Sequence, residues 1–306
     1  MKLETNTLLN MENKDFAVFI LTHGRHDNVK TLSTLKKCGY TGNIYFIVDN
    51  EDKTIEQYKK NFGEKWVKVF DKKAMADEVD EGNNFDERRT ITHARNACFK
   101  IAKEIGITYF IQLDDDYTAF DFRIDTQSKE NCGAIKPINN LNLVFDLLLN
   151  YYKTIPALSI AFAQGGDFIG GINNGKGSYR FNKRKCMNSF ICSTEREFQF
   201  IGAMNEDVNT YTTNGSRGKL FLTIPFVSIT QTATQSNKSG ITDMYLRFGT
   251  YCKAFTTAMM QPSSVKVSMM NSTHARIHHS IKWINTSPMI LDEKYKKSLE
   301  GGAEKN

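Results

Sequence analysis

Three consecutive aspartates, Asp114, Asp115 and Asp116, directly follow the apolar segment at residues 109–113. Adjacent carboxylates repel one another, so a nearby cation has to offset that repulsion. Mg²⁺ and Mn²⁺ prefer hard oxygen ligands and keep open coordination positions for phosphate oxygens. The cluster therefore predicts a divalent-cation site, and the alternative is an exposed acidic turn that caps a following helix.

Segments that would position these acids alternate along the first third of the chain. Short continuous apolar runs are typical of strands covered on both faces, and they lie at residues 16–21, 43–48, 66–70 and 107–113. Amphipathic segments between them predict helices at residues 28–37, 54–62 and 91–105. Residues 71–90 are polar and charged, which predicts a mobile loop.

Repeated strand–helix units with apolar strands predict a Rossmann-like α/β fold, with a mostly parallel sheet and helices on both sides. Ligands of such sheets bind beyond the carboxyl ends of the strands. Residues 23–25 follow the first predicted strand, Asp49 follows the second, and residues 114–116 follow the fourth. The topology therefore predicts that these three groups meet at one rim of the sheet.

The chain beyond residue 125 is less regular. Its pattern predicts a helix at residues 141–152 and strands at residues 158–164 and 219–230. The pairs Gly165-Gly166 and Gly170-Gly171 suit a flexible loop that closes over a ligand and excludes water.

Composition indicates an ordinary globular protein, with 40% hydrophobic and 24% charged residues. No apolar run approaches the ~20 residues that a membrane-spanning helix needs. The six cysteines are scattered without close metal-ligand spacing, which is typical of reduced thiols in the cytosol. A net charge of +6 permits an anionic partner such as a nucleotide or nucleic acid without requiring one.

Four segments together resemble the GT-A glycosyltransferases, and in finer pattern the TET-associated glycosyltransferase family of phage DNA-modifying enzymes. They are "ILTHGRHDNVKTLSTLKKCGYTGNIYFIVDNED" at 20–52, "HARNACFKIAKEIGITYFIQLDDD" at 93–116, "NEDVNTY" at 205–211 and "ARIHHSIKW" at 275–283. The Asp-x-Asp pattern alone is a weak signal, and its order with the other three segments is what makes the resemblance specific.

The resemblance implies a GT-A fold, which combines a mostly parallel sheet, flanking helices and an irregular acceptor-side half. It implies one catalytic domain, with a nucleotide-sugar-binding half at residues 1–125 and an acceptor-binding, catalytic half at residues 126–291. Residues 292–306 are expected to be a flexible tail. The implied donor is a UDP-sugar held with Mn²⁺ or Mg²⁺.

Roles for the aspartates follow from the GT-A pattern. The resemblance implies that Asp116 is a direct metal ligand and that Asp114 contacts the metal or the donor's ribose. Asp115 is expected among the donor-binding residues, although its side chain should point to the other face if the strand continues.

Further donor contacts are implied for residues near the other strand ends. Thr22, Gly24 and Arg25 resemble the segment that cradles the nucleotide, and Asp49 resembles the acid that reads the base. Arg95 is expected to contact the donor's phosphate or sugar. The alternatives are a helix cap for Asp49 and a solvated surface charge for Arg95.

Acceptor-side residues are implied in the second half. Either Glu206 or Asp207 would take the proton from the acceptor hydroxyl as general base, and the alternative is an exposed acidic turn. A neutral histidine from the segment at 275–283 would complete the metal shell. Adjacent strand residues point to opposite faces, so only one of His278 and His279 is expected to bind the metal, and we favour His278.

The predicted function is transfer of a sugar from a UDP-sugar to a hydroxymethylated pyrimidine, such as 5-hydroxymethylcytosine, in double-stranded DNA. The predicted setting is the cytoplasm of a bacteriophage-infected cell, without a membrane partner. Alternatives are a glycan or protein acceptor, a sugar nucleotidyltransferase, and a non-enzymatic DNA-binding protein. The single glycine in "LTHGRHDN" argues against the nucleotidyltransferase, which usually has a glycine-rich phosphate loop after its first strand.

Overall fold

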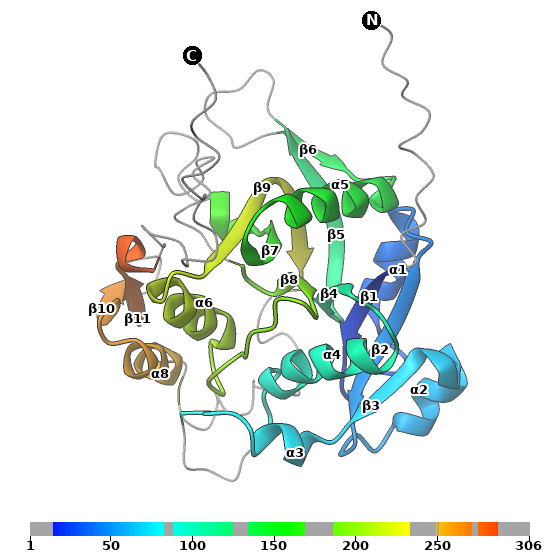
Figure 1. Ribbon diagram of the computed structural model, residues 1–306, viewed down its shortest axis with the longest axis horizontal. Coiled ribbons are helices and arrows are strands. Elements are labelled where there is room, and N and C mark those ends of the chain that lie inside the picture. The colour runs from blue at the N-terminus through cyan, green and yellow to red at the C-terminus, as the bar shows by residue number, and fades with distance from the viewer. Residues whose placement is uncertain are drawn as a thin grey trace, which may run out of the picture.

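The computed structural model describes residues 15–82, 88–124, 134–168, 186–232, 249, 251–270 and 275–286. Its centre is a nine-stranded sheet with the strand order β3-β2-β1-β4-β8-β7-β9-β5-β6 (Figure 1). The strands are β1 (Phe16–Leu21), β2 (Asn43–Asp49), β3 (Val67–Phe70), β4 (Tyr109–Asp114), β5 (Tyr117–Ile124), β6 (Ala134–Pro137), β7 (Ala157–Ala163), β8 (Ser189–Ser193) and β9 (Leu220–Gln231).

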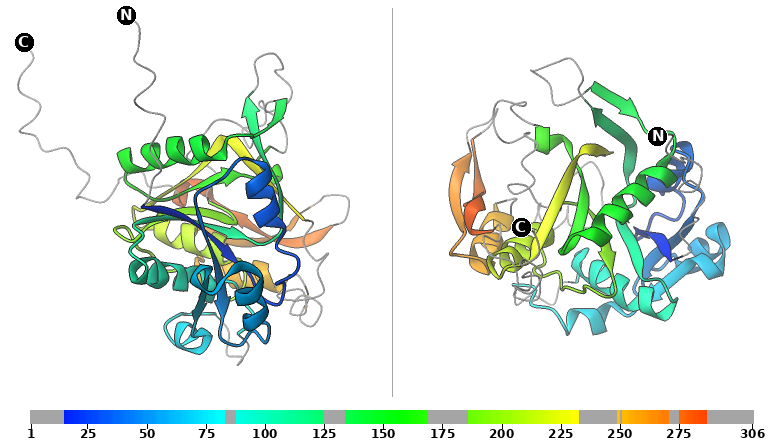
Figure 2. Two further views of the ribbon diagram at one scale, coloured as in Figure 1. Left: turned by 90° about the vertical axis from the view of Figure 1, so that its right-hand side faces the viewer. Right: turned by 45° about the horizontal axis from the view of Figure 1, so that its top comes forward.

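Helices cover both faces of this sheet (Figure 2). They are α1 (Lys30–Lys37), α2 (Ile55–Phe62), α3 (Lys72–Ala76), α4 (Thr92–Glu104), α5 (Leu141–Thr154), α6 (Glu206–Ser216) and α8 (Cys252–Met260). Short 3₁₀ turns occupy Glu64–Trp66, Gly165–Phe168 and Trp283–Asn285. None of the helices in the described ranges is long and apolar enough to cross a membrane.

Strand directions confirm the predicted α/β class and its mostly parallel sheet. β3, β2, β1 and β4 pair in parallel, and β7 pairs in parallel with β9. β8 is antiparallel to both β4 and β7, whereas β5 is antiparallel to both β9 and β6. β8 and β5 therefore run against β1, and the other strands of this sheet run with it.

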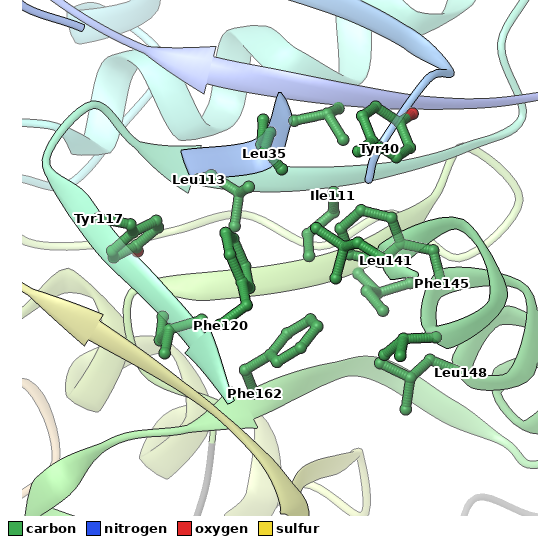
Figure 3. Packing of buried hydrophobic residues seen from close by; sticks show 14 of the residues in the cluster. Leu35, Tyr40, Ile111, Leu113, Tyr117, Phe120, Leu141, Phe145, Leu148 and Phe162 are labelled. Atoms are coloured by element: carbon green, nitrogen blue, oxygen red, sulfur yellow. The ribbon is translucent and has the colours of Figure 1, made fainter. Parts of the chain in front are cut away.

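Successive side chains of the buried strands point alternately to the two faces of the sheet, and a hydrophobic core lies on each face. Phe16, Val18 and Ile20 of β1 join α1 and α5 in one core, part of which Figure 3 shows. The intervening β1 residues pack with α4 in the other core. Burial on both faces explains why these strands are continuous apolar runs in the sequence.

Two predictions about loops differ from the structure. The predicted mobile loop at residues 71–90 contains α3, so that prediction was wrong for this stretch. The Asp71 side chain caps α3 by accepting a hydrogen bond from the backbone N of Ala74 at 2.9 Å, and Met75 anchors the helix in the core. The Gly165-Gly166 pair begins a 3₁₀ turn, whereas Gly170-Gly171 lies outside the described residues.

The two predicted halves share the single sheet. β5 belongs to residues 1–125, yet it pairs with β9 and β6 from the second half. A separate antiparallel hairpin, β10 (Val265–Met270) with β11 (Arg276–Ile281), lies with α8 beside α6 in both views (Figure 1, Figure 2).

Candidate active site

The carboxyl ends of β1, β2 and β4 meet at one rim, as the predicted topology requires. Leu21 at the end of β1 pairs with Asp114 at the end of β4, and Asp49 ends β2 on the other side of β1. The polar residues that follow these strands therefore face a common region. Three separate hydrogen-bonded groups occupy it.

Arg95 joins two distant acidic segments in the interior. Its Nη2 donates to Asp114 Oδ1 at 3.1 Å, and its Nε donates to Glu206 Oε1 at 3.0 Å. The guanidinium is 1% exposed and lies over the rings of Phe190 and Phe200. Its third nitrogen, Nη1, is buried without a hydrogen-bond partner among the described residues. Arg95 is therefore no solvated surface charge, and it holds the end of β4 against the start of α6.

Asp114 lies in an electrostatically crowded position. Burial raises the pKa of its carboxyl to about 7, Arg95 opposes that shift, and the charges of Asp116 and Glu206 add to it. Its second oxygen accepts a hydrogen bond from Gln231 Nε2 at 3.3 Å. Only part of the negative charge at this strand end is thus compensated by groups of the described chain.

Asp115 points away from this network and organises the loop after β1. Its Oδ1 pairs with Arg25 Nη1 at 2.5 Å, and its Oδ2 accepts from Thr22 Oγ1 at 2.8 Å. Thr22 Oγ1 also lies 2.8 Å from the Tyr58 hydroxyl, which accepts from the Arg25 backbone N. β4 ends at Asp114 and does not continue through Asp115, but the two side chains still have different partners.

Asp116 carries an unsatisfied acceptor. Its Oδ1 is buried and has no hydrogen-bond partner within the described ranges. Burial raises the pKa of this carboxyl, while Gln231 and Arg25 act in the opposite direction. A buried carboxylate oxygen without a donor is costly unless a ligand or cation completes it.

Asp49 belongs to the third hydrogen-bonded group at this rim. Its Oδ2 lies 2.6 Å from His23 Nδ1, and its Oδ1 accepts from Lys72 Nζ at 3.4 Å. The hydrogen bond that the His23 ring makes to Asp49 raises the pKa of His23. Asp52 accepts from the backbone N of Gly24 at 2.6 Å, and Gly24 has a φ of +65°. This conformation favours glycine at the turn.

Glu206 and Asp207 form the first turn of α6 and are both buried. Asp207 Oδ1 accepts a hydrogen bond from the backbone N of Val208 at 2.7 Å. Burial raises the pKa of Asp207 to about 7, and the adjacent charge of Glu206 adds to the shift. The pair is not an exposed acidic turn, and the raised pKa lets Asp207 exchange a proton near neutral pH.

The histidines lie on β11, which confirms a strand for this segment. His279 Nδ1 is 3.3 Å from Asn205 Nδ2, and Asn205 immediately precedes Glu206. The His278 and His279 rings are in contact, with centroids 4.2 Å apart, so they are not cleanly separated by the strand faces as expected. Burial lowers the pKa of His278, and it lowers that of His279 to about 4, so both imidazoles are neutral near pH 7.

The carboxylates at the end of β4 suit a hard divalent cation in their chemistry. Asp114 is incompletely compensated, and the Oδ1 of Asp116 is an orphaned acceptor. In the described ranges, however, no group of at least three His, Cys, Asp or Glu side chains is placed to hold a metal. The predicted set of Asp114, Asp116 and His278 is therefore not gathered into one preformed shell.

Several polar partners in the site had no signal in the sequence. Gln231 at the end of β9 reaches Asp114, and Asn188 Nδ2 in turn donates to Gln231 Oε1 at 2.9 Å. Tyr58 and Lys72 come from α2 and α3. These contacts join residues that are far apart in the chain. Glutamine, asparagine, tyrosine and lysine also occur at many positions outside functional sites, so their residue types gave no signal.

Comparison with known protein families gives a match over most of the chain. A family model described as TET-Associated Glycosyltransferase matches residues 16–240. No curated protein sequence matches the chain.

Several solved structures resemble the chain at low sequence identity. Glucosyl-3-phosphoglycerate synthase from Mycobacterium tuberculosis, in complex with Mn²⁺, UDP and phosphoglyceric acid, has 10% identity and a TM-score of 0.43, covering 87% of this chain and 86% of its own. The mannosyltransferase PcManGT from Pyrobaculum calidifontis, in complex with GDP-Man and Mn²⁺, has 11% identity and a TM-score of 0.45, covering 80% and 73%.

The family match extends over most of the described sheet, from the start of β1 past the end of β9. It includes the Asp-x-Asp strand end, Arg95 and the Glu206-Asp207 pair. The chain therefore belongs to the TET-associated glycosyltransferase family and is a glycosyltransferase that depends on a nucleotide-sugar donor.

Proposed function

We propose that the enzyme transfers a sugar from a UDP-sugar to the hydroxymethyl group of a modified pyrimidine in double-stranded DNA, with Mn²⁺ or Mg²⁺ as cofactor. The proposed setting is the cytoplasm of a phage-infected cell. The supporting observation is the Arg95 bridge, which joins the Asp-x-Asp strand end to the buried acid pair of α6. Asp114, proposed for the donor side, and Glu206, next to the proposed base, are thereby held by one guanidinium, and direct sugar transfer requires such proximity of the two sides.

Asp114 and Asp116 are the proposed metal ligands. The unpartnered Oδ1 of Asp116 and the crowded carboxyl of Asp114 supply hard oxygen donors whose charge the described residues satisfy incompletely. When bound, a divalent cation would neutralise charge that develops on the departing diphosphate. His278 is the proposed third ligand, and the described residues hold no assembled three-ligand group.

Asp207 is the proposed general base. Glu206 is committed to Arg95 through a 3.0 Å charge-assisted hydrogen bond, whereas the Asp207 side chain accepts its hydrogen bond from a neutral backbone N–H. A general base works best when its pKa lies near the working pH, and the pKa of Asp207 is raised to about 7. In the reaction, the hydroxymethyl oxygen bonds to the sugar carbon, the bond from that carbon to the diphosphate breaks, and Asp207 takes the hydroxyl proton.

Residues after β1 and β2 are the proposed donor contacts. Asp115 and Thr22 hold Arg25 and its loop in a fixed position, while the backbone at Gly24 is open, since a Cβ added there would meet no heavy atom within 4 Å. Asp49 is held by His23 and Lys72 at the next strand end. Asp115 thus serves the donor site by positioning Arg25, and Asp49 remains the proposed contact to the base.

Mass spectrometry of nucleosides tests this function directly. The enzyme is incubated with Mn²⁺, a panel of nucleotide sugars and duplex DNA that contains 5-hydroxymethylcytosine or 5-hydroxymethyluracil. We expect a sugar mass increment on the modified base with the wild type and none with Asp116→Ala. An Asp77→Ala variant, changed at an exposed acid that directly follows α3, serves as the matched control.

The outcomes separate the parts of the proposal. An increment that disappears in Asp116→Ala and persists in Asp77→Ala supports donor, acceptor and metal site together. Release of nucleotide diphosphate with sugar transfer to a glycan or protein, and no increment on DNA, would refute the DNA acceptor. An increment of equal yield in EDTA would refute the metal.

A further inference from the structure

The segment around the β10–β11 hairpin has an unusual charge composition. Residues 244–291 contain no Asp or Glu, although the chain has 34 acids among its 306 residues. The same segment contains Arg247, Lys253, Lys266, Arg276 and Lys282. It is therefore purely cationic, and this pattern favours an anionic partner.

The hairpin presents part of this charge on one exposed face. Lys266 pairs with Ser280 across the two strands, and Arg276 pairs with Met270 at the other end. Residues that alternate along each strand share a face, and the register places Met270 and His278 on the same face as Lys266, Ser268, Arg276 and Ser280. Met270 and His278 are half-buried, whereas Lys266, Ser268, Arg276 and Ser280 are exposed. These four exposed residues, the basic face, combine cationic groups with hydroxyl groups that donate hydrogen bonds.

The hairpin is fixed to α6, next to the acid pair. Asn205 Nδ2 contacts His279 of β11 at 3.3 Å and donates to Thr257 Oγ1 of α8 at 3.0 Å. Further along α6, Tyr211 stacks on Trp283 with ring centroids 6.0 Å apart. An anion bound on the hairpin is therefore held in a defined position relative to Glu206-Asp207.

We propose that the basic face of β10–β11 is the surface that binds the acceptor duplex, with Lys266 and Arg276 contacting backbone phosphates. This inference rests on the proposed function, because it assigns the acceptor as double-stranded DNA. A two-stranded β-ribbon fits the major groove of B-DNA, and a pyrimidine 5-hydroxymethyl group projects into that groove. Phosphate contacts fix the register of a protein on DNA, so the ribbon aligns the target hydroxyl with the acids of α6.

Fluorescence anisotropy with a labelled duplex, measured over a range of salt concentrations, tests the proposal. The test variant is Lys266→Gln/Arg276→Gln in the full chain. The matched control is Lys36→Gln/Lys60→Gln, which removes two exposed charges on α1 and α2, away from the hairpin (Figure 1). Equal thermal unfolding midpoints of both variants would establish that each remains folded.

Loss of two phosphate contacts should reduce the slope of log K against log salt by about 2. Affinity at 0.1 M salt should fall by roughly 10-fold to 60-fold. In transfer assays the test variant should raise the KM for DNA more than it lowers kcat. The control variant should change neither the slope nor the KM for DNA appreciably.

The outcomes distinguish this inference from the proposed function. If the wild type binds duplex DNA and glycosylates it, but the test variant keeps the wild-type salt slope, the ribbon is not the DNA surface and the proposed function stands. If the wild type neither binds nor modifies any duplex, the DNA acceptor itself is wrong and the ribbon assignment is overturned with it.

Discussion

Replacement of Asp207 by asparagine should stabilise the fold while it abolishes sugar transfer. Asp207 is 7% exposed, and its burial beside Glu206 raises the pKa of the carboxyl to about 7. Above that pH the folded protein holds a buried charge that the unfolded chain leaves in water. Asparagine has nearly the same shape and can still accept the hydrogen bond from Val208, but it carries no charge.

The size of the effect follows from proton linkage. The folded carboxyl binds its proton more tightly than the unfolded one, whose pKa is 3.8. The contribution of Asp207 to the free energy of unfolding therefore falls as pH rises from 3.8 to about 7, and it is constant above that pH. Each pKa unit corresponds to about 1.4 kcal/mol. The variant should therefore gain about 4 kcal/mol in free energy of unfolding at pH 8, and about 2 kcal/mol at pH 5.

Urea unfolding in EDTA at the two pH values measures both gains, and Glu104→Gln, at an exposed acid of α4, is the control. The transfer assay on the same variants should show loss of activity in Asp207→Asn once the metal is restored. A gain that is the same at pH 5 and pH 8, or a variant less stable than the wild type at pH 8, would refute the reasoning about the buried charge. Retained transfer would refute the assignment of Asp207 as the base.

Two other substitutions test the packing that assembles the site. Arg95→Met removes the cation that joins Asp114 and Glu206. The free energy of unfolding at pH 8, measured in urea, should fall by about 3–5 kcal/mol because two buried acids lose their partner. An unchanged unfolding midpoint would contradict the bridge. Gly215→Ala would place a Cβ within 1.9 Å of the Thr286 carbonyl oxygen, so thermal unfolding should show a loss of about 1–3 kcal/mol, whereas Ser216→Ala, at an exposed neighbour, should have little effect.

Much of the first half of the fold was predictable from the sequence. The structure has β1 at the predicted residues 16–21, and β2 extends the predicted 43–48 by one residue. These strands are buried on both faces, so each of their positions must be apolar and the local pattern is unambiguous. α3 has only five residues, and β8, although buried along its whole length, has serine at both ends. Both therefore leave a weaker pattern and were not predicted.

The sequence predicted which residues lie at the candidate site better than it predicted the contacts between them. Strand ends of a parallel sheet share an edge, which is why Asp49 and the aspartates at 114–116 were expected at one rim. The burial of Arg95 and its link to Glu206 across 111 residues had no counterpart in local pattern. The same holds for the reach of Gln231 to Asp114 across 117 residues.

The sequence by itself determined the fold class, the rim and the residue types available for chemistry, because periodic burial and topology follow from short stretches of chain. Only the tertiary structure decided the ionisation of each acid, the cationic side chain that pairs with it, and the position of the Glu206-Asp207 pair beside the hairpin. Those properties depend on burial and on charges brought within a few ångströms by packing, as at Asp115 with Arg25 and at Asp207 beside Glu206. No local pattern encodes such distances, because each is set by many long-range contacts together.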